Sequence, residues 1–191
     1  MTISRYAQKG IDAQKGMVRK IFGSRIHNEY PGAFVNVATD PDYPHLAFTL
    51  HLDGDGSKII QRLLWFFETG DIRILRGAVD DALQMNYGDI AAAGFVEGLI
   101  VLGNVIDIYH IENHIPKDQI LDELAVRFVE LLALHEKYGY HHNYFMGGET
   151  ADLPDQVRSM VFNAATFART EKTNIIKGNV ADGDAIYGFA S

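Results

Sequence analysis

Residues 45–58 read HLAFTLHLDGDGSK, and this short stretch decides the type of fold. His45–Leu52 is rich in apolar and aromatic side chains, which predicts a buried strand. The turn Asp53–Gly56 follows, and Ser57 stands where it can cap a helix over Lys58–Glu68. A buried strand that turns directly into a helix is typical of domains in which helices pack on a sheet.

The sequence on both sides of this stretch continues the alternation of strands and helices. The other predicted helices are Asp12–Phe22, Arg73–Ala93 and Lys117–Tyr138, and the other predicted strands are Gly98–Tyr109, His141–Met146, Arg158–Arg169 and Asp184–Phe189. We expect Gly98–Tyr109 to be a central strand. The pattern predicts an α/β (α+β) fold, a mixed sheet packed by helices, in one domain spanning residues 1–191.

The composition is that of a globular protein and excludes several other classes. Of 191 residues, 47% are hydrophobic, and 17 Lys and Arg stand against 25 Asp and Glu, which gives a net charge of −8. This acidic balance argues against binding to a nucleic-acid backbone. No stretch approaches the ~18–20 apolar residues of a membrane helix, and the N-terminus lacks the layout of a secretion signal. The absence of Cys excludes disulfides and a cysteine nucleophile. We expect a cytoplasmic protein without nucleic-acid or membrane partners.

The segment Asp53–Lys58 is the first of three that could carry chemistry. Its glycines allow a ligand to approach the backbone, and the start of the following helix presents free N–H groups to an anion. Lys58 suits phosphate, whereas Asp53 and Asp55 suit a metal ion. The alternative is a tight turn with solvated acids, because the segment lacks the full P-loop pattern.

Two further segments carry acidic side chains. Asp81 and Asp89 are eight residues apart, which places them near one face of the predicted helix. Gly147–Pro154, GGETADLP, sets Glu149 just after a predicted strand, where a carboxylate can hold a hard cation. A solvated helix face and a plain loop are the respective alternatives.

Histidines do not have the spacing of a metal site. His110 and His114 flank Glu112, which is not the metalloprotease order. No nucleophile elbow and no dinucleotide-binding fingerprint is present either. We therefore expect hard oxygen ligands rather than imidazole at any metal site.

In their order along the chain, these segments resemble the ATP-binding N-terminal domain of the aminoimidazole ribonucleotide synthetase (phosphoribosylformylglycinamidine cyclo-ligase) family. The superfamily also includes thiamine-monophosphate kinase and formylglycinamidine ribonucleotide amidotransferase. The matches at Tyr6–Asp12 and Gly147–Pro154 favour the cyclo-ligase among these enzymes. The matches are Tyr6–Asp12 (YAQKGID) with YAxxGVD, Asp53–Lys58 (DGDGSK) with DGVGTK, Asp81 and Asp89–Gly94 (DIAAAG) with D…NDLxxxGA, Gly147–Pro154 with GGETAEMP, and Asp182–Ser191 (DGDAIYGFAS) with GDxLIGLxSSG.

The resemblance implies an ATP- and Mg²⁺-dependent ligase of purine biosynthesis that works as a homodimer paired through its sheets, with a small ribonucleotide as substrate. In that reaction the formamide oxygen of formylglycinamidine ribonucleotide is phosphorylated. An amidine nitrogen then closes the imidazole ring and expels phosphate, which gives aminoimidazole ribonucleotide. By position, the implied metal ligands are Asp53, Asp89 and Glu149. The implied catalytic residues are the same three acids and Lys58. The implied nucleotide-binding residues are Asp53, Gly54, Gly56, Ser57, Lys58, Asp81, Asp89, Gly148, Glu149 and Thr150.

The chain also departs from the family pattern. Gly88 stands where the family has Asn, and Asp55 replaces a small apolar residue. The sequence stops at Ser191, before the family's HSNG segment, so we expect the N-terminal half of such an enzyme, without the C-terminal domain and with little or no turnover by itself. A non-catalytic dimerisation or regulatory module and another small-molecule ATP-dependent kinase of the superfamily are the alternatives.

Overall fold

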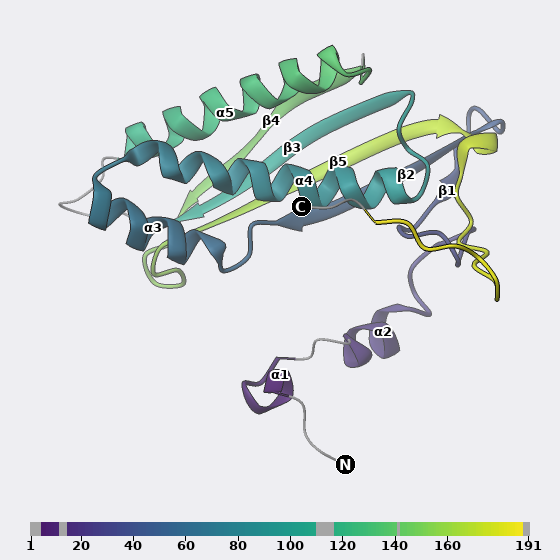
Figure 1. Ribbon diagram of the computed structural model, residues 1–191, viewed down its shortest axis with the longest axis horizontal. Helices are drawn as coiled ribbons and strands as arrows, with labels where there is room; N and C mark the ends of the chain where they lie inside the picture. The colour runs from purple at the N-terminus through teal and green to yellow at the C-terminus, as the bar shows by residue number, and fades with distance from the viewer. Residues whose placement is uncertain (1–4, 12–14, 110–116, 141, 189–191) are drawn as a thin grey trace.

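The computed structural model describes residues 5–11, 15–109, 117–140 and 142–188, which form a sheet with helices on one side (Figure 1). The strands lie in the order β1-β2-β5-β3-β4. β3 and β4 run parallel, and the other neighbouring pairs are antiparallel, so the sheet is mixed as predicted. The strands are β1 (Ala38–Thr39), β2 (Leu46–Gly54), β3 (Leu99–Ile108), β4 (Asn143–Asp152) and β5 (Met160–Glu171).

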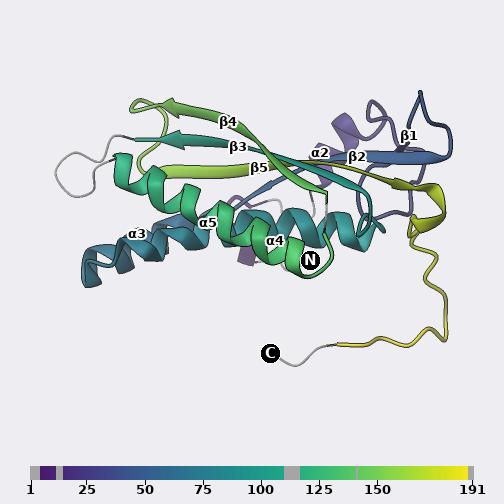
Figure 2. The same ribbon diagram turned by 90° about the horizontal axis from the view of Figure 1, so that it is seen from above.

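Three long helices cover one face of this sheet, as Figure 2 shows most clearly. The single helix predicted over Arg73–Ala93 is instead a 3₁₀ turn over Ile72–Arg76 followed by α4 over Gly77–Ala92, because Asp71 accepts the Arg73 backbone N–H and starts the tighter turn. The helical elements are α1 (Arg5–Gln8), α2 (Gly16–Phe22), α3 (Lys58–Thr69), η1 (Ile72–Arg76), α4 (Gly77–Ala92), α5 (Lys117–Lys137) and η2 (Lys172–Asn174).

The core lies between the sheet and α4 with its neighbours. Alternate residues of β5, from Met160 to Thr170, are buried, as the two-residue period of a strand requires when one face is covered. α4 lies against β2 and β5 and buries Val79, Leu83 and Ile90 completely. β2 and β5 together support α4.

The opposite face of the sheet is uncovered within the described part of the chain (Figure 2). Leu50 and Leu52, which alternate with the covered residues of β2, are 60% and 63% exposed. Phe48 and Phe167 stack on this face with ring centroids 5.9 Å apart. An apolar face of this kind is the feature that the predicted pairing of sheets requires.

Two strand predictions differ from the structure. β4 continues beyond Met146 to Asp152, so the GGETAD residues belong to a strand rather than to a loop after it. No strand forms over Asp184–Gly188, whose apolar side chains Ile186 and Tyr187 are 99% and 90% exposed. The reason is that nothing in the described chain covers them, so alternation alone gives no pairing partner. Residues 189–191 lie outside the described residues.

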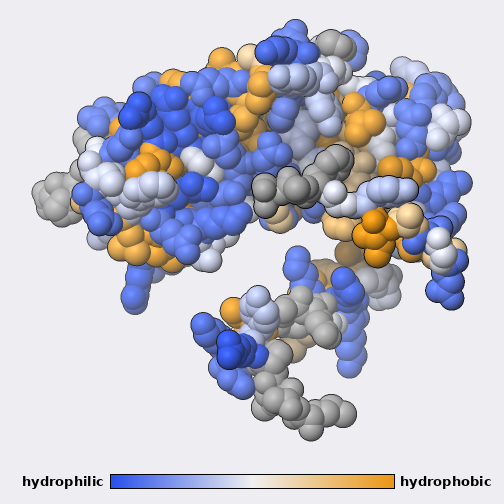
Figure 3. All heavy atoms as spheres, viewed as in Figure 1, coloured by the Kyte–Doolittle hydropathy of each residue, from blue (hydrophilic) through white to orange (hydrophobic). Residues whose placement is uncertain are grey.

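The N-terminal segment stands apart from the sheet and its helices (Figure 1). α2 begins at Gly16 and buries none of its residues, and Asp12 lies outside the described residues. The side of the molecule that carries the helices is mainly hydrophilic, with hydrophobic patches between the charged residues (Figure 3). Within the described residues, no helix combines the length and apolar character needed to cross a bilayer.

Candidate functional site

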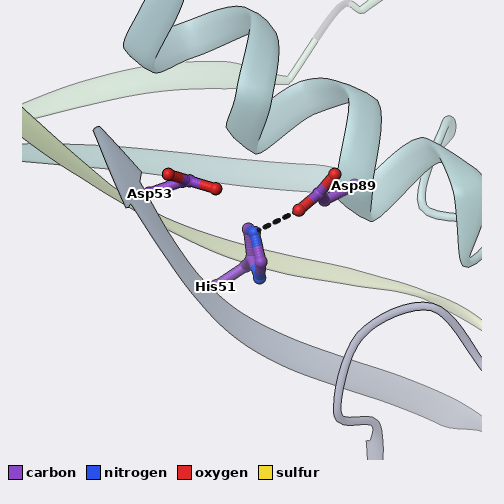
Figure 4. Close-up of side chains that lie close together, drawn as sticks. All are labelled: His51, Asp53 and Asp89. Atoms are coloured by element: carbon purple, nitrogen blue, oxygen red, sulfur yellow. Dashed lines mark ion pairs between the residues drawn. The ribbon is translucent and has the colours of Figure 1, made fainter. Parts of the chain in front are cut away.

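His51, Asp53 and Asp89 form a cluster between the end of β2 and the last two turns of α4 (Figure 4). One ligand atom of each side chain lies within 4.8 Å of the others, and Nε2 of His51 is 2.9 Å from Oδ2 of Asp89. The His51 and Asp89 side chains are 21% and 25% exposed. The cluster therefore combines two carboxylates and one imidazole at a place that solvent reaches.

The local structure explains why these side chains meet. His51 and Asp53 are two residues apart on β2, so both point toward the helix-covered face. Asn86, three residues before Asp89 on α4, donates to the carbonyl oxygens of Asp53 (3.2 Å) and Ala164 (3.3 Å). This fully buried amide fixes α4 against β2 and β5 and so sets the position of Asp89.

Glycine occupies two positions of the turn after β2 for different structural reasons. A Cβ on Gly54 would lie 2.1 Å from Oδ1 of Asn163 and 2.6 Å from the carbonyl oxygen of Phe162, so close packing against β5 requires glycine. Gly56 has φ of +60°, a conformation that glycine adopts without strain. Ser57 occupies the N-cap position of α3 but makes no side-chain capping bond, which differs from the expectation.

A second polar cluster lies beside the same turn, around Asp81. Nζ of Lys58 donates to Oδ1 of Asp81 at 2.9 Å, and Arg62 donates to the other carboxylate oxygen. Burial opposes ionisation of Asp81, but the hydrogen bonds from Lys58 and Arg62 outweigh it and lower the pKa of this carboxyl. The predicted phosphate-binding Lys58 is thus held by Asp81 in this structure, with its side chain 52% exposed.

Asp55 is the buried acid of this second cluster. Its side chain is 2% exposed, and neither carboxylate oxygen has a hydrogen-bond partner among the described residues. Burial raises the pKa of Asp55 to about 6, a rise that the positive charge of Arg62 limits. The sequence suggested that Asp55 suits a metal ion, whereas the structure places this carboxyl inside the protein.

Glu149 does not join Asp53 and Asp89. In the sheet register Glu149 lies opposite Val105, which lies opposite Asn163 and then Gly54. Glu149 is therefore three strands from β2, about 14 Å at the spacing of neighbouring strands. The Glu149 side chain also points to the face of the sheet opposite Asp53, because Glu149 is aligned with Gly54, and adjacent residues of a strand point to opposite faces. The three acids predicted as one metal site converge only in part.

The two glycines before Glu149 serve the backbone of β4. Gly147 has φ of +91°, and the pairing with β3 shifts register at this point. A Cβ on Gly148 would lie 2.0 Å from the carbonyl oxygen of Asn104, which leaves room for no other residue. The Thr150 backbone N–H donates to Oε1 of Glu149 at 3.1 Å. The GGET segment is a glycine-rich irregularity within an edge strand.

The sequence reasoning missed His51 and Asn86. Its expectation of oxygen ligands rather than imidazole stays a prediction, although His51 lies among the acids. The available signal was the spacing His51-x-Asp53 at the end of a strand, which puts both side chains on one face. His110, Glu112 and His114 lie outside the described residues.

Neither a protein-family model nor a curated protein sequence matches this chain. Among solved structures, ThiL (AaThiL) in complex with AMPPCP and TMP superposes with a TM-score of 0.51 and 11% identity, over 90% of this chain and 45% of that one. The fold is that of ThiL. A second structure, thiamine monophosphate kinase (ThiL) from Aquifex aeolicus, gives a TM-score of 0.49 and 12% identity, over 88% of this chain and 44% of its own. PurL from T. maritima, complexed with ADP, gives a TM-score of 0.44 and 14% identity, over 83% of this chain and 22% of the PurL chain.

The likeness to ThiL confirms the predicted fold class, a mixed sheet packed by helices. At 11% identity, this likeness shows the fold alone. This chain spans less than half of the ThiL chain that it matches.

Proposed function

We propose that this chain is the ATP-binding part of an ATP-dependent enzyme, with Asp53 and Asp89 holding the divalent cation of the nucleotide. The observation that supports this most directly is the convergence of these two acids from β2 and α4. All Lys and Arg residues belong to the described part of the chain, and none of them pairs with either acid. Two carboxylates that no Lys or Arg neutralises form a suitable site for Mg²⁺, which prefers oxygen ligands.

The turn between β2 and α3 is the proposed place for the phosphates. Gly56 and Ser57 are exposed close to the start of α3, where helix N–H groups favour an anion, whereas Gly54 is half-buried and its backbone N–H donates to Oδ1 of Asp53. Lys58 is exposed enough to leave Asp81 for a phosphate oxygen, because Arg62 continues to neutralise Asp81. In this proposal Asp81 acts by holding Lys58 ready, and a bound cation supplies charge that offsets the triphosphate.

The three predicted nucleotide contacts on β4, which are Gly148, Glu149 and Thr150, stay predictions. They lie on the far edge of the sheet from β2, so one chain does not bring them to the Asp53–Asp89 pair. A contact of these residues with the same nucleotide requires a second subunit.

At the finer level we propose the cyclo-ligase reaction, conversion of formylglycinamidine ribonucleotide to aminoimidazole ribonucleotide. The motifs at Tyr6–Asp12 and Gly147–Pro154 support it. A small-molecule kinase is the second candidate, and the likeness of the fold to ThiL bound to AMPPCP and TMP favours it. Both candidates need γ-phosphoryl transfer to an oxygen of a small substrate, so they share the proposed metal and phosphate positions.

Calorimetry with ATP and MgCl₂ tests the shared part of the proposal. We expect the wild-type chain to bind, and Asp89→Asn to weaken binding by at least about tenfold because one ligand of the cation is lost. Asp122→Asn, an exposed acid on α5, is the matched control and should bind like the wild type. Absence of binding by the wild type would refute the proposal and favour the non-catalytic module.

We also propose a homodimer paired through the uncovered face of the sheet. Leu50 and Leu52 supply exposed apolar surface there, and burying such surface favours association. Analytical ultracentrifugation should give a dimer for the wild type and a monomer for Leu50→Lys/Leu52→Lys. Ile60→Lys, an equally exposed apolar residue on α3, is the control. A wild-type monomer at all concentrations would contradict this part.

A further inference from the structure

His51 makes the cluster chemically different from a pair of carboxylates. Its Nε2 atom lies 2.9 Å from Oδ2 of Asp89, and Asp53 contributes a third ligand atom within 4.8 Å. Figure 4 shows the imidazole between β2 and α4, directed at Asp89. The side chain is held in place by its strand position, two residues before Asp53, rather than by a loop.

We propose that His51, Asp53 and Asp89 form a three-ligand metal site that prefers Mn²⁺ or another first-row transition cation to Mg²⁺. This inference rests on the proposed function and deepens it, since it names the cation of the same site. Imidazole nitrogen is a good ligand for the transition cations, whose affinity for nitrogen ligands exceeds that of Mg²⁺. Mg²⁺ prefers oxygen ligands and retains several waters.

The distances suit such a site. With metal–ligand bonds of about 2.1 Å, neighbouring ligand atoms of an octahedral site lie about 3.0 Å apart and opposite ones about 4.2 Å apart. The separation of His51 Nε2 from Asp89 Oδ2 matches neighbouring ligands. The full span of the cluster, within 4.8 Å, needs only a small contraction.

A second observation at the same place points to a missing partner. Thr166 lies directly opposite His51 in the pairing of β2 with β5 and is completely buried, yet its hydroxyl has no hydrogen-bond partner among the described residues. Oδ1 of the buried Asn86 is likewise unpaired, although its Nδ2 bonds the carbonyl oxygen of Asp53. Buried polar atoms are rarely left without a partner. Nε2 of His51, in the cluster itself, is also buried without a hydrogen-bond partner among the described residues, and a bound cation supplies a partner for this atom.

The competing explanation is a simple His–Asp ion pair. The chain contains such a pair elsewhere, His27 with Glu29, at 3.1 Å. That pair lies on the surface, with His27 74% exposed, and no third ligand accompanies it among the described residues. His27→Gln is therefore a matched control for His51→Gln, because each variant removes one imidazole beside one carboxylate.

Pulsed electron paramagnetic resonance of Mn²⁺ added to the full chain tests the proposal directly. We expect ¹⁴N coupling from a directly bound imidazole in the wild type and in His27→Gln, and no such coupling in His51→Gln. Circular dichroism and thermal unfolding of each variant establish that it is folded. Bound Mn²⁺ without nitrogen coupling in the wild type would overturn the proposal.

Calorimetric titrations with Mn²⁺ and Mg²⁺ provide the second measurement. In the wild type we expect tighter binding of Mn²⁺, and in His51→Gln a loss of Mn²⁺ affinity of roughly tenfold or more, with Mg²⁺ affinity changed about threefold or less. An unchanged ratio of the two affinities in His51→Gln would overturn the proposal.

The two proposals fail differently. ATP and Mg²⁺ binding without nitrogen coupling to Mn²⁺ would overturn the role of His51 and leave the nucleotide site intact. Nitrogen-coupled Mn²⁺ with no affinity for ATP would support the three-ligand site and refute the nucleotide function.

Discussion

Two clusters of acidic side chains flank the turn after β2, and they differ in what balances their charge. Asp81 is paired with both Lys58 and Arg62, so its charge is neutralised within the chain. Among the described residues, His51 is the basic side chain that lies beside Asp53 and Asp89. The first cluster has the character of a structural ion pair, whereas the second has an excess of negative charge that a cation can offset. Whether a cluster of acids can bind a cation therefore depends less on how close the acids lie than on how many basic side chains neutralise them.

The buried carboxyl of Asp55 gives the largest expected effect. Its pKa of about 6, against 3.8 for the ordinary group, means that ionisation opposes folding as pH rises. Asp55→Asn should raise the free energy of unfolding by about 3 kcal/mol at pH 8 but by only about 0.5 kcal/mol at pH 4, where the carboxyl is protonated in the folded chain and roughly half ionised in the unfolded chain. Urea unfolding at both pH values measures this. An equal gain at pH 4 and pH 8 would contradict it.

Removing a cation from the neutralised cluster should have the next largest effect. Arg62→Ala leaves Asp81 with Lys58 alone and takes a positive charge away from Asp55, so we expect a loss of about 2 kcal/mol of unfolding free energy, discounted for partial exposure. Arg158→Ala, an exposed arginine between β4 and β5, is the control. Equal unfolding midpoints for the two variants would show that the cluster does not contribute to stability.

The unbalanced cluster should respond to cations instead. At ten times its dissociation constant, a divalent cation that binds only the folded chain adds about 1.4 kcal/mol. We expect Mn²⁺ to raise the melting temperature of the wild type and of Asp81→Asn, but not that of Asp53→Asn/Asp89→Asn. A response that survives the double substitution would place the cation elsewhere.

Substitution of Gly88 should have the smallest effect on stability, and it tests the backbone of α4 without changing any charge. It lies inside α4 beside Asp89, and a Cβ there would meet no atom within 4 Å. Gly88→Ala should therefore stabilise the chain by about 0.5–1 kcal/mol, because alanine restricts the unfolded chain and favours helix. Gly94→Ala is the opposite case, since its Cβ would lie 2.0 Å from the carbonyl oxygen of Asn174. Similar stabilities for the two variants would be inconsistent with the described geometry.

The sequence predicted most helices and strands but not which strands lie next to each other in the sheet. β2, α3, β3, α5 and β5 agree with their predicted ranges to within about two residues, because each has a strong apolar period and clear end signals. The extension of β4 through Gly147 was not predicted, since glycine pairs usually end strands, and here they permit an irregular pairing with β3. β3, predicted as a central strand, lies in the interior of the sheet between β5 and β4, but periodicity does not show that β5 separates it from β2.

The site was predictable only in part for a similar reason. Motif order suggested that Asp53 and Asp89 meet, and their side chains do lie in one cluster. The order of strands and the face on which a side chain points decide whether Glu149 can join them, and neither is visible in the motif. His51 escaped notice because a histidine within an apolar strand has no spacing signal until the adjacent acid is considered.

The central position of β5 has a consequence for the nascent chain. β2 and β3 make no pairing with each other, and β5 is hydrogen-bonded to both. Until residues 160–171 leave the ribosome, the earlier strands lack the partner that joins them, and α4 lacks half of its support. Folding thus depends on contacts between distant parts of the chain, which are slow to form, and the unjoined strands expose edges to aggregation in the interval. Chaperone demand during synthesis should end abruptly once this single segment emerges.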